Sequence, residues 1–459
     1  MLEKLRVVFS IPELRQKIFL TLFLLAVYRI GYHVRLPVLT NVDLAMSGDM
    51  QAFLNKVALF SATDLSSLTI FGLGIAPYIS ASIIFQLLGT VWAPIEQLRK
   101  EGAVGRKKIN EYTRYLTVVI CVIQSWAYLQ FSVVSVEQST VSSVFHSGTQ
   151  LSFGWVVTTV TIMTAGSMFL MWLGEQIDEY GIGNGVSLLI MAGILAQMPK
   201  ALWDLRQNMT SDLSGLSANT IGPDVLIVLA FLFIGVVFAV VFITMAQRRI
   251  QMQSAKHVRG RRVFGGTKQF LPLKINQSGV MPIIFASSML MIPGLVFGVF
   301  ANFFSSGDDA GSGWSSFMAT IFSGLSNMFS SQSSFSYNVL YVVFIFFFCF
   351  FWTSIMFNPK EMSQNLQDSG AFIPGYRPGK RTADYLEKVM VRITYVGAAF
   401  LAVVAIVPTI ITAQFGVSYS VAAFYGGTGL LIAVSVAFDL IQKIDSHLLM
   451  RNYKGLLEQ

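Results

Sequence analysis

Long uninterrupted apolar runs recur along this chain, and they restrict its fold more than any other feature. Runs such as VLIVLAFLFIGVVFAVVFITM (225–245) and VLYVVFIFFFCFFW (339–352) carry no polar face. About 20 such residues suffice for a helix to cross a bilayer. In hydrocarbon each backbone polar group needs a partner inside its own segment, so the runs must be helical. We predict ten spans, near residues 18–36, 70–92, 114–136, 154–174, 183–203, 223–246, 277–301, 337–357, 390–412 and 418–442.

The composition agrees with a chain that is almost entirely membrane domain. Of its 459 residues, 54% are hydrophobic and only 12% are charged, which excludes a soluble globular protein. The basic residues fall almost entirely into alternate connections, and the other connections hold only Lys56, Lys200 and Arg206. Short loops rich in Lys and Arg stay in the cytosol. We therefore expect both termini to be cytosolic and the number of spans to be even.

The predicted spans divide into five and five, which gives an N-terminal half (1–222) and a C-terminal half (223–459). An odd number of spans in each half inverts one half relative to the other, an arrangement that builds a pathway between repeats. Glycine or proline interrupts four spans, and irregular backbone at membrane depth is tolerated where it lines a cavity. The interruptions are FGLGIAPYIS (71–80), GIGNGVS (181–187), SGVMPIIF (278–285) and FYGGTGLL (424–431).

The connections differ from one another in character. Residues 53–69 suit either a short amphipathic helix folded back toward the protein or a helix at the membrane interface. Residues 302–336 are rich in Ser and Gly and are expected to form a mobile connector. The cytosolic loops 247–275 and 358–389 are long and basic, and the first has eight basic and no acidic residues. We favour a docking surface for an acidic or anionic partner over a purely topological role.

Familiar catalytic patterns are missing from the chain. It has no GxxxxGK[ST] and no HExxH motif, its four histidines are scattered, and no enzyme activity, metal or cofactor is expected. Cys121 and Cys349 are expected to be buried free thiols. Ionisable residues are nearly absent at mid-depth, which argues against an ion-coupled carrier.

Aliphatic side chains lie beside the interrupted spans instead. A ring of them at mid-membrane would close a pore by dewetting, although helix packing explains any single one equally well. They are Ile75, Ile79, Val186, Ile190, Ile284 and Ile432.

Several segments together resemble the SecY family, and the resemblance runs from about residue 15 to 442. The segments are PYISASIIFQLL (77–88), KEGAVGRKKINEYTRY (100–115), MFLMWLGEQIDEYGIGNGVSL (168–188), LPLKIN (271–276), FNPKEMSQNLQDSGAFIPGYRPGKRT (357–382) and FYGGTGLLI (424–432). The resemblance implies an all-α polytopic membrane protein with ten transmembrane helices, in two inverted five-helix halves around a central hourglass pore. It also implies a passive channel that moves unfolded secretory polypeptides across the membrane and releases transmembrane segments sideways into lipid.

The resemblance assigns roles to individual residues. The six aliphatic residues match the pore ring. A plug is expected at about 57–69, with Phe60, Ser61, Asp64, Leu65 and Leu68. The lateral gate would include Ser80, Gln86 and Asn276. Docking of the SecA motor or the ribosome would use Arg261, Arg262 and Arg377. Tyr180 stands where the family usually has a basic residue.

The implied partners are SecE and SecG in a heterotrimer, the SecA ATPase, the ribosome, signal sequences and nascent chains, with SecDF, YidC and anionic lipids as further partners. The implied location is the bacterial cytoplasmic (inner) membrane, with thylakoid membrane as an alternative. Two other functions stay open on the residues alone. One is a small-solute secondary transporter, and the other is a scaffold whose basic loops hold ribosomes at the membrane.

Overall fold

The computed structural model describes residues 11–36, 69–134, 146–147, 150–151, 153–207, 223–254, 257–259, 262–264, 268–306, 313–330, 334–415 and 428–457. The chain divides into two compact units, Met1–Asp204 with Val436–Gln459, and Leu205–Ser435. Each unit is described by itself. The division into halves at residue 222 stays a prediction.

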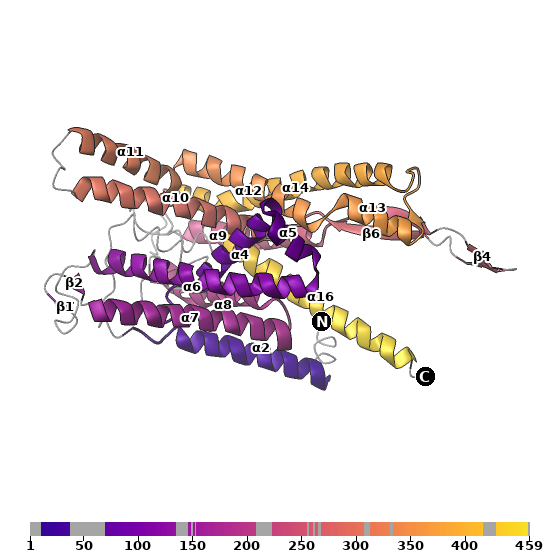
Figure 1. Cartoon of the computed structure of the whole chain (residues 1–459), viewed down its shortest axis with the longest axis horizontal. Coiled ribbons are helices and arrows are strands. Elements are labelled where there is room, and N and C mark those ends of the chain that lie inside the picture. Colours follow the sequence, from indigo (N-terminus) through magenta and orange to yellow (C-terminus); the bar gives the residue numbers. More distant parts are fainter. Residues whose placement is uncertain are drawn as a thin grey trace. The chain divides into compact units, whose positions relative to one another are not determined.

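Ten helices occupy the ten segments that the apolar runs predict (Figure 1). They are α2 (Pro12–Gly31), α4 (Ala76–Val91), α6 (Ala103–Val134), α7 (Phe153–Tyr180), α8 (Gly185–Gln207), α9 (Pro223–Met245), α10 (Met281–Ser306), α12 (Phe335–Met356), α14 (Lys380–Phe415) and α16 (Thr428–Leu457). Several extend beyond the apolar run into the predicted connections. For example, α14 begins ten residues before the predicted span, because no glycine or proline lies between Lys380 and Val396 to end it.

Within the described residues, four helices are by themselves long and apolar enough to cross a membrane: Phe153–Tyr180, Val225–Met245, Phe335–Asp368 and Lys380–Thr412. The bent pair α4 and α5 (Ala93–Lys100) makes a fifth candidate. Gly185–Pro199 and Met281–Leu290 form shorter apolar helices. Internal prolines lie at the ends of these shorter stretches: Pro199 is the last residue of the first, and Pro293 comes three residues after the second.

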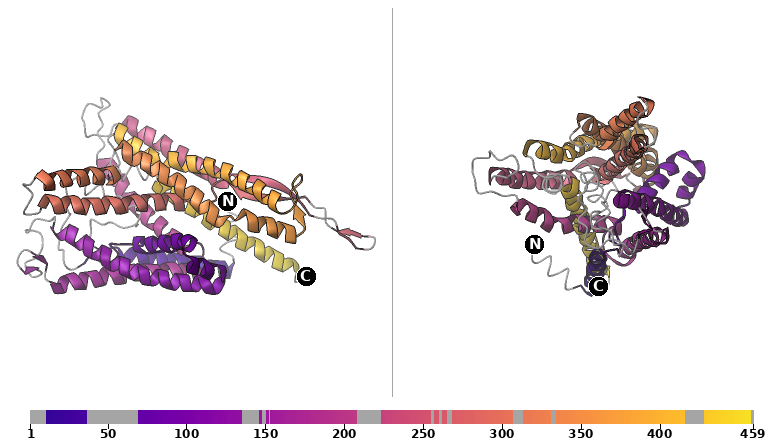
Figure 2. Two further views of the ribbon diagram at one scale, coloured as in Figure 1. Left: turned by 45° about the horizontal axis from the view of Figure 1, so that its top comes forward. Right: turned by 90° about the vertical axis from the view of Figure 1, so that its left-hand side faces the viewer.

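The prediction of a mobile connector over residues 302–336 is wrong for much of that range. Residues Gly313–Ser330 form helix α11, which lies alongside the C-terminal part of α10 in the second unit (Figures 1 and 2). Phe322 of α11 stacks on the rings of Phe300 and Phe304 of α10, with centroids 5.5 and 5.6 Å apart. The Ser and Gly content concealed an aromatic repeat that packs one helix on the other.

Antiparallel β-structure accompanies the helices, and the apolar runs did not predict it. In the second unit, β3 (Gln247–Ser254) pairs with β6 (Lys268–Lys274) from Gln247 opposite Lys274 to Gln253 opposite Lys268. The short β7 (Ala371–Phe372) pairs with the other edge of β3. Beyond this sheet, β4 (His257–Arg259) and β5 (Arg262–Phe264) form a two-stranded ribbon. In the first unit, β1 (His146–Ser147) pairs with β2 (Gln150–Leu151).

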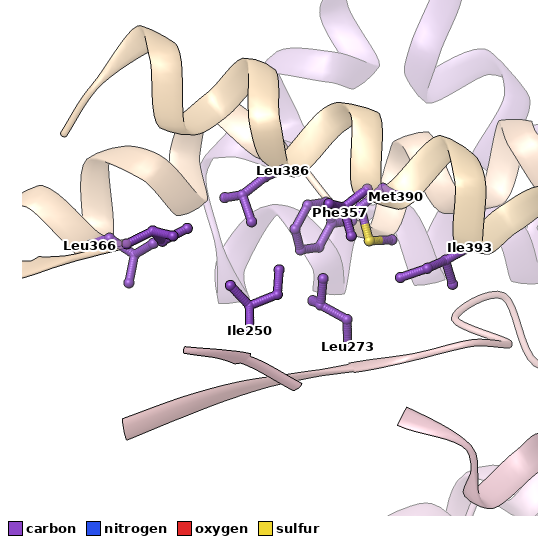
Figure 3. Packing of buried hydrophobic residues seen from close by; sticks show 9 residues of the cluster. Ile250, Leu273, Phe357, Leu366, Leu386, Met390 and Ile393 are labelled. Carbon is purple, nitrogen blue, oxygen red and sulfur yellow. The ribbon is translucent and has the colours of Figure 1, made fainter. Parts of the chain in front are cut away.

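A hydrophobic core joins this sheet to the helices that follow it (Figure 3). Ile250 of β3 and Leu273 of β6 point from the sheet toward Phe357, Leu386 and Met390. Helix α13 (Pro359–Asp368) adds Leu366, and its N-terminus is capped by Asn358, whose Oδ1 accepts from the Lys360 N–H at 3.1 Å. The two basic loops, 247–275 and 358–389, therefore form one folded layer rather than two separate loops.

Candidate functional site

The start of α4 is held by a turn that also contacts α7. The Ile70 N–H donates to the Val34 carbonyl at 3.1 Å, and Gly74 adopts a left-handed φ of 58° just before the helix. Ile75 is the N-cap residue and is buried. Its carbonyl accepts from the Ile79 N–H at 3.1 Å. Because Ile75 and Ile79 are four residues apart, their side chains lie on one face of the chain as α4 begins.

A second pair of predicted ring residues opens α8. Asn184 is the last residue before the helix, and its Oδ1 accepts from the Ser187 N–H at 3.0 Å, which is an N-cap bond. The Asp178 Oδ1 accepts from the Gly185 N–H at 2.7 Å. These two side chains satisfy backbone donors that have no partner within the helix. Val186 and Ile190 follow four residues apart, with Ile190 buried.

The second unit contributes the other two predicted ring residues. Ile284 lies in the first turn of α10 and Ile432 lies near the start of α16, and both are buried. The carbonyl of Ile284 accepts from the hydroxyls of Ser287 and Ser288, each at 2.8 Å. The two units thus hold four and two of the six residues, and the closed ring stays a prediction.

The predicted gate residues differ in how many of their polar side-chain atoms have a hydrogen-bond partner. On α4, Ser80 is half-buried, and Gln86 donates through Nε2 to the Ser82 hydroxyl at 3.1 Å. The Gln86 Oε1 is buried and has no hydrogen-bond partner among the described residues. In the second unit, Asn276 donates through Nδ2 to the Gly279 carbonyl at 3.0 Å, so it shapes its own turn. The predicted bond across the gate stays a prediction.

Arg377 projects from a tightly held loop. Gly375 and Gly379 on either side of it have left-handed φ values of 88° and 100°. The Arg377 carbonyl accepts from the Thr382 hydroxyl at 2.9 Å, and the Gly379 carbonyl accepts from the Ser363 hydroxyl at 2.7 Å. The side chain of Arg377 is exposed. A guanidinium on a fixed loop is well suited to bind carboxylate or phosphate.

The remaining predicted residues are only partly described. Arg262 begins β5, and its backbone pairs with Arg259. Arg261 lies outside the described residues, as do the predicted plug residues Phe60, Ser61, Asp64, Leu65 and Leu68. Tyr180, the departure from the family pattern, is exposed at the end of α7.

Sequence reasoning missed the residues that fix the turn between α7 and α8. The Thr21 hydroxyl of α2 accepts from the Ile182 N–H at 3.2 Å, across 161 positions of sequence. On α6, Arg114 binds Glu175 of α7 through two hydrogen bonds of 2.9 and 2.7 Å. The Asn184 cap could have been found from its place before an apolar run. The Thr21 and Arg114 contacts have no local sequence signal.

Known proteins match this chain over almost its whole length. The SecY family model matches residues 69–441. The protein translocase subunits SecY of Streptomyces galbus and Aquifex aeolicus are 40% and 37% identical, and the alignments cover 98% and 100% of both chains. That of Chlamydia trachomatis is 40% identical over 99% of this chain and 98% of its own.

Solved structures share the fold at lower identity. One described as "The structure of a protein conducting channel" gives a TM-score of 0.59 at 18% identity, over 94% of this chain and 91% of that chain. Sec61 in a canine ribosome–channel complex gives 0.55 at 17%, with the same coverage. The family match and the full-length relatives, together with the helical fold, define a ten-span, multi-pass membrane protein of the protein-conducting channel class, which is not a class of enzymes. The chain belongs to the SecY family.

Proposed function

We propose that this chain is the channel through which unfolded secretory polypeptides cross the bacterial cytoplasmic membrane, and from which transmembrane segments leave sideways into lipid. The observation that carries the proposal is the full-length similarity to proteins named protein translocase subunit SecY. The scarcity of ionisable residues at mid-depth supports a passive pore over a carrier that binds ions. Force would come from the SecA ATPase or from the ribosome.

The pore is closed by an apolar ring of Ile75, Ile79, Val186, Ile190, Ile284 and Ile432. Burial of four of these side chains and the i, i+4 spacing of two pairs support the assignment. Aliphatic side chains offer a translocating chain no hydrogen bonds, so they part around it and close behind it. The same lack of polar groups excludes water and ions from a narrow constriction.

Two further parts complete the closed state. The plug, at about residues 57–69, seals the non-cytosolic side. In a related solved structure, the plug domain is described as maintaining a membrane seal. The lateral gate lies between the second span (about 75–91) and the seventh span (about 277–296), with Ser80, Gln86 and Asn276. The unpaired buried Oε1 of Gln86 supports a polar partner across this gate, because an unpaired buried acceptor is costly.

Partners dock on the folded basic layer. Arg261, Arg262 and Arg377 bind the ribosome or SecA, and the rigid loop around Arg377 supports this role. The similarity to Sec61 in a ribosome–channel complex favours the ribosome as one partner. SecE and SecG complete a heterotrimer, and SecDF, YidC, signal sequences, nascent chains and anionic lipids act on the same channel. Both termini and the sheet lie in the cytosol, because they belong to the set of connections that holds most of the basic residues.

Depletion of the chain in living cells tests the function. We expect precursors of secreted proteins to accumulate with their signal sequences uncleaved. Unimpaired export would contradict the proposal. Saturable uptake of a small solute by the purified chain in liposomes would favour a secondary transporter instead.

Ring substitutions test the pore in planar bilayers. We expect Ile79→Asn and Ile284→Asn to raise ion conductance through the resting channel, because an amide in the constriction allows water to enter. Ile79→Val and Ile284→Val serve as controls and should stay closed. Unchanged conductance in the Asn variants would remove these residues from the ring.

A further inference from the structure

The second unit contains an uncharged helical hairpin formed by α10 and α11. Between Lys274 and Lys360 the only charged residues are Asp308 and Asp309, in the connection between the two helices. Ring contacts join the helices along their length: Phe322 of α11 with Phe300 and Phe304, and Phe329 with Phe297. The Ser326 hydroxyl also donates to the Gly294 carbonyl of α10 at 3.2 Å. The connection between two predicted spans is therefore a packed helix rather than a simple loop.

The lengths of the neighbouring helices place α11 at a definite depth. Helix α12 has 22 residues and α10 has 26, which correspond to about 33 and 39 Å at the helical rise. The two are in register where Phe285 contacts Phe348 and Trp352, with centroids 5.8 and 5.3 Å apart. Counted from that level, α10 runs about 9 Å farther than the start of α12. The hydrocarbon core is about 30 Å thick, and about 40–45 Å with both headgroup layers. One headgroup layer is about 5–8 Å thick, so the end of α10 reaches through the headgroups of the non-cytosolic side. Helix α11 has 18 residues, about 27 Å, and runs back along α10 from that end as far as Gly294. It therefore extends from the headgroups into the acyl chains.

The surface of α11 is divided into three faces. One face packs on α10 and includes Phe322, Ser326 and Phe329. A second face is exposed and apolar. Its members are Trp314, Phe317, Ile321 and Met328, which are 69%, 55%, 40% and 38% exposed. We name these four residues the α11 apolar stripe. A third face is exposed and polar, with Ser316, Thr320, Ser323 and Asn327.

The polar face is only weakly polar, because two of its hydroxyls already donate to backbone carbonyls of the same helix. Thr320 donates to the Ser316 carbonyl at 2.9 Å, and Ser323 donates to the Thr320 carbonyl at 2.9 Å. An apolar stripe beside bonded hydroxyls, on a helix without charge, suits a segment that runs from the headgroups into the acyl chains. Trp is enriched at the headgroup level of the membrane, and Trp314 lies at the end of α11 next to the connection with α10. The exposed apolar residues of the adjoining span, Phe335, Val339, Val343 and Phe347, continue the same kind of surface on α12.

We propose that α11 is a membrane anchor whose apolar stripe contacts the phospholipids of the non-cytosolic leaflet, from the headgroups at Trp314 to the acyl chains at Met328. The occupant of this surface is lipid rather than a protein partner. The lack of charge along α10, α11 and α12, the exposed apolar residues of both α11 and α12, and the depth that the helix lengths give α11 carry this choice. The anchor would fix the end of α10, the helix that begins close to the predicted gate residue Asn276.

Depth-dependent quenching tests the anchor on the full chain in phosphatidylcholine and phosphatidylglycerol vesicles. Cys121 and Cys349 are replaced by Ala, and one cysteine is placed at Phe317 on the apolar stripe or at Ser323 on the polar face. Each is labelled with a polarity-sensitive fluorophore. We expect headgroup-level nitroxide lipids to quench the Phe317→Cys label several-fold more than the Ser323→Cys label. Iodide in the water should show the opposite preference.

Two other outcomes would overturn the proposal. If iodide quenches both labels equally and nitroxide lipids quench neither, the hairpin stands in water. If neither quencher reaches position 317 while iodide still reaches position 323, protein covers the stripe. The difference between the two labels also reports that the hairpin is folded, because an unfolded segment would expose positions 317 and 323 equally. The result does not depend on translocation activity, so it is separate from the test of function.

Discussion

Single residues set how closely the helices of this channel approach one another. A methyl group added to Gly185 would lie 2.0 Å from the carbonyl oxygen of Gly174, and no real Cβ atom tolerates that distance. The Asp178 carboxylate binds the same Gly185 N–H, so the start of α8 is fixed from two directions. The position needs glycine for space rather than for backbone freedom.

We expect Gly185→Ala to destabilise the protein by about 1–3 kcal/mol, because α7 and α8 must separate to admit the methyl group. Thermal unfolding of the purified chain in detergent measures the loss. Gly154→Ala is the matched control, since nothing lies within 4 Å of a Cβ at that exposed position of α7. Equal melting temperatures for the two variants would show that the close approach is not maintained.

A second residue-level prediction concerns the exposed loop. We expect Arg377→Glu to reduce SecA-driven translocation severalfold while the fold stays intact, because the loop is held by its backbone and not by the guanidinium. Arg381→Glu, also exposed and four residues away, is the control for net charge. Translocation of a precursor into vesicles is the measurement. Wild-type rates in Arg377→Glu would remove the docking role.

At the scale of elements, the apolar runs predicted the membrane-spanning helices well, but they did not predict the helix and the strands in the connections. Helix α12 and all but the first two residues of α9 lie in runs that carry no charged residue, so their positions follow from hydrocarbon length alone. Helix α11 escaped prediction because its phenylalanines are separated by Ser and Gly, and only the partner α10 reveals their common face. The strands β3 and β6 escaped because tertiary packing on α13 and α14 decides them. The same holds for the site, where the i, i+4 aliphatic pairs were visible and the Thr21 contact was not.

The core beneath the sheet should determine whether the basic layer is ordered. Leu386 is fully buried there, so Leu386→Ala is expected to destabilise this layer by about 2–5 kcal/mol. Lys388→Ala, exposed on the same helix, should have little effect. Limited proteolysis within residues 247–275 reports the difference, and equal cleavage rates would show that the sheet is ordered by something other than this core.

At the scale of the whole molecule, the distribution of charge predicts which ends face the cytosol. Cys121 and Cys349 are both buried, so they contribute little background to cysteine labelling. We expect a membrane-impermeant maleimide to label Gln251→Cys on β3 only from the cytosolic side, and Thr320→Cys on α11 only from the opposite side. Both positions are exposed. Labelling of both from one side would contradict the predicted topology.

Helix α7 touches backbone on two sides, and this limits how the first unit can move. A methyl group at Gly166 would lie 2.2 Å from the Ile70 carbonyl, just as one at Gly185 would collide with Gly174. At both points the atoms nearest to the added methyl group belong to backbone, which cannot rotate aside as a side chain can. The turn before α4, helix α7 and the first turn of α8 must therefore move together as one rigid body. Any movement that widens the pore has to displace these three segments together, and cannot separate one of them from the other two.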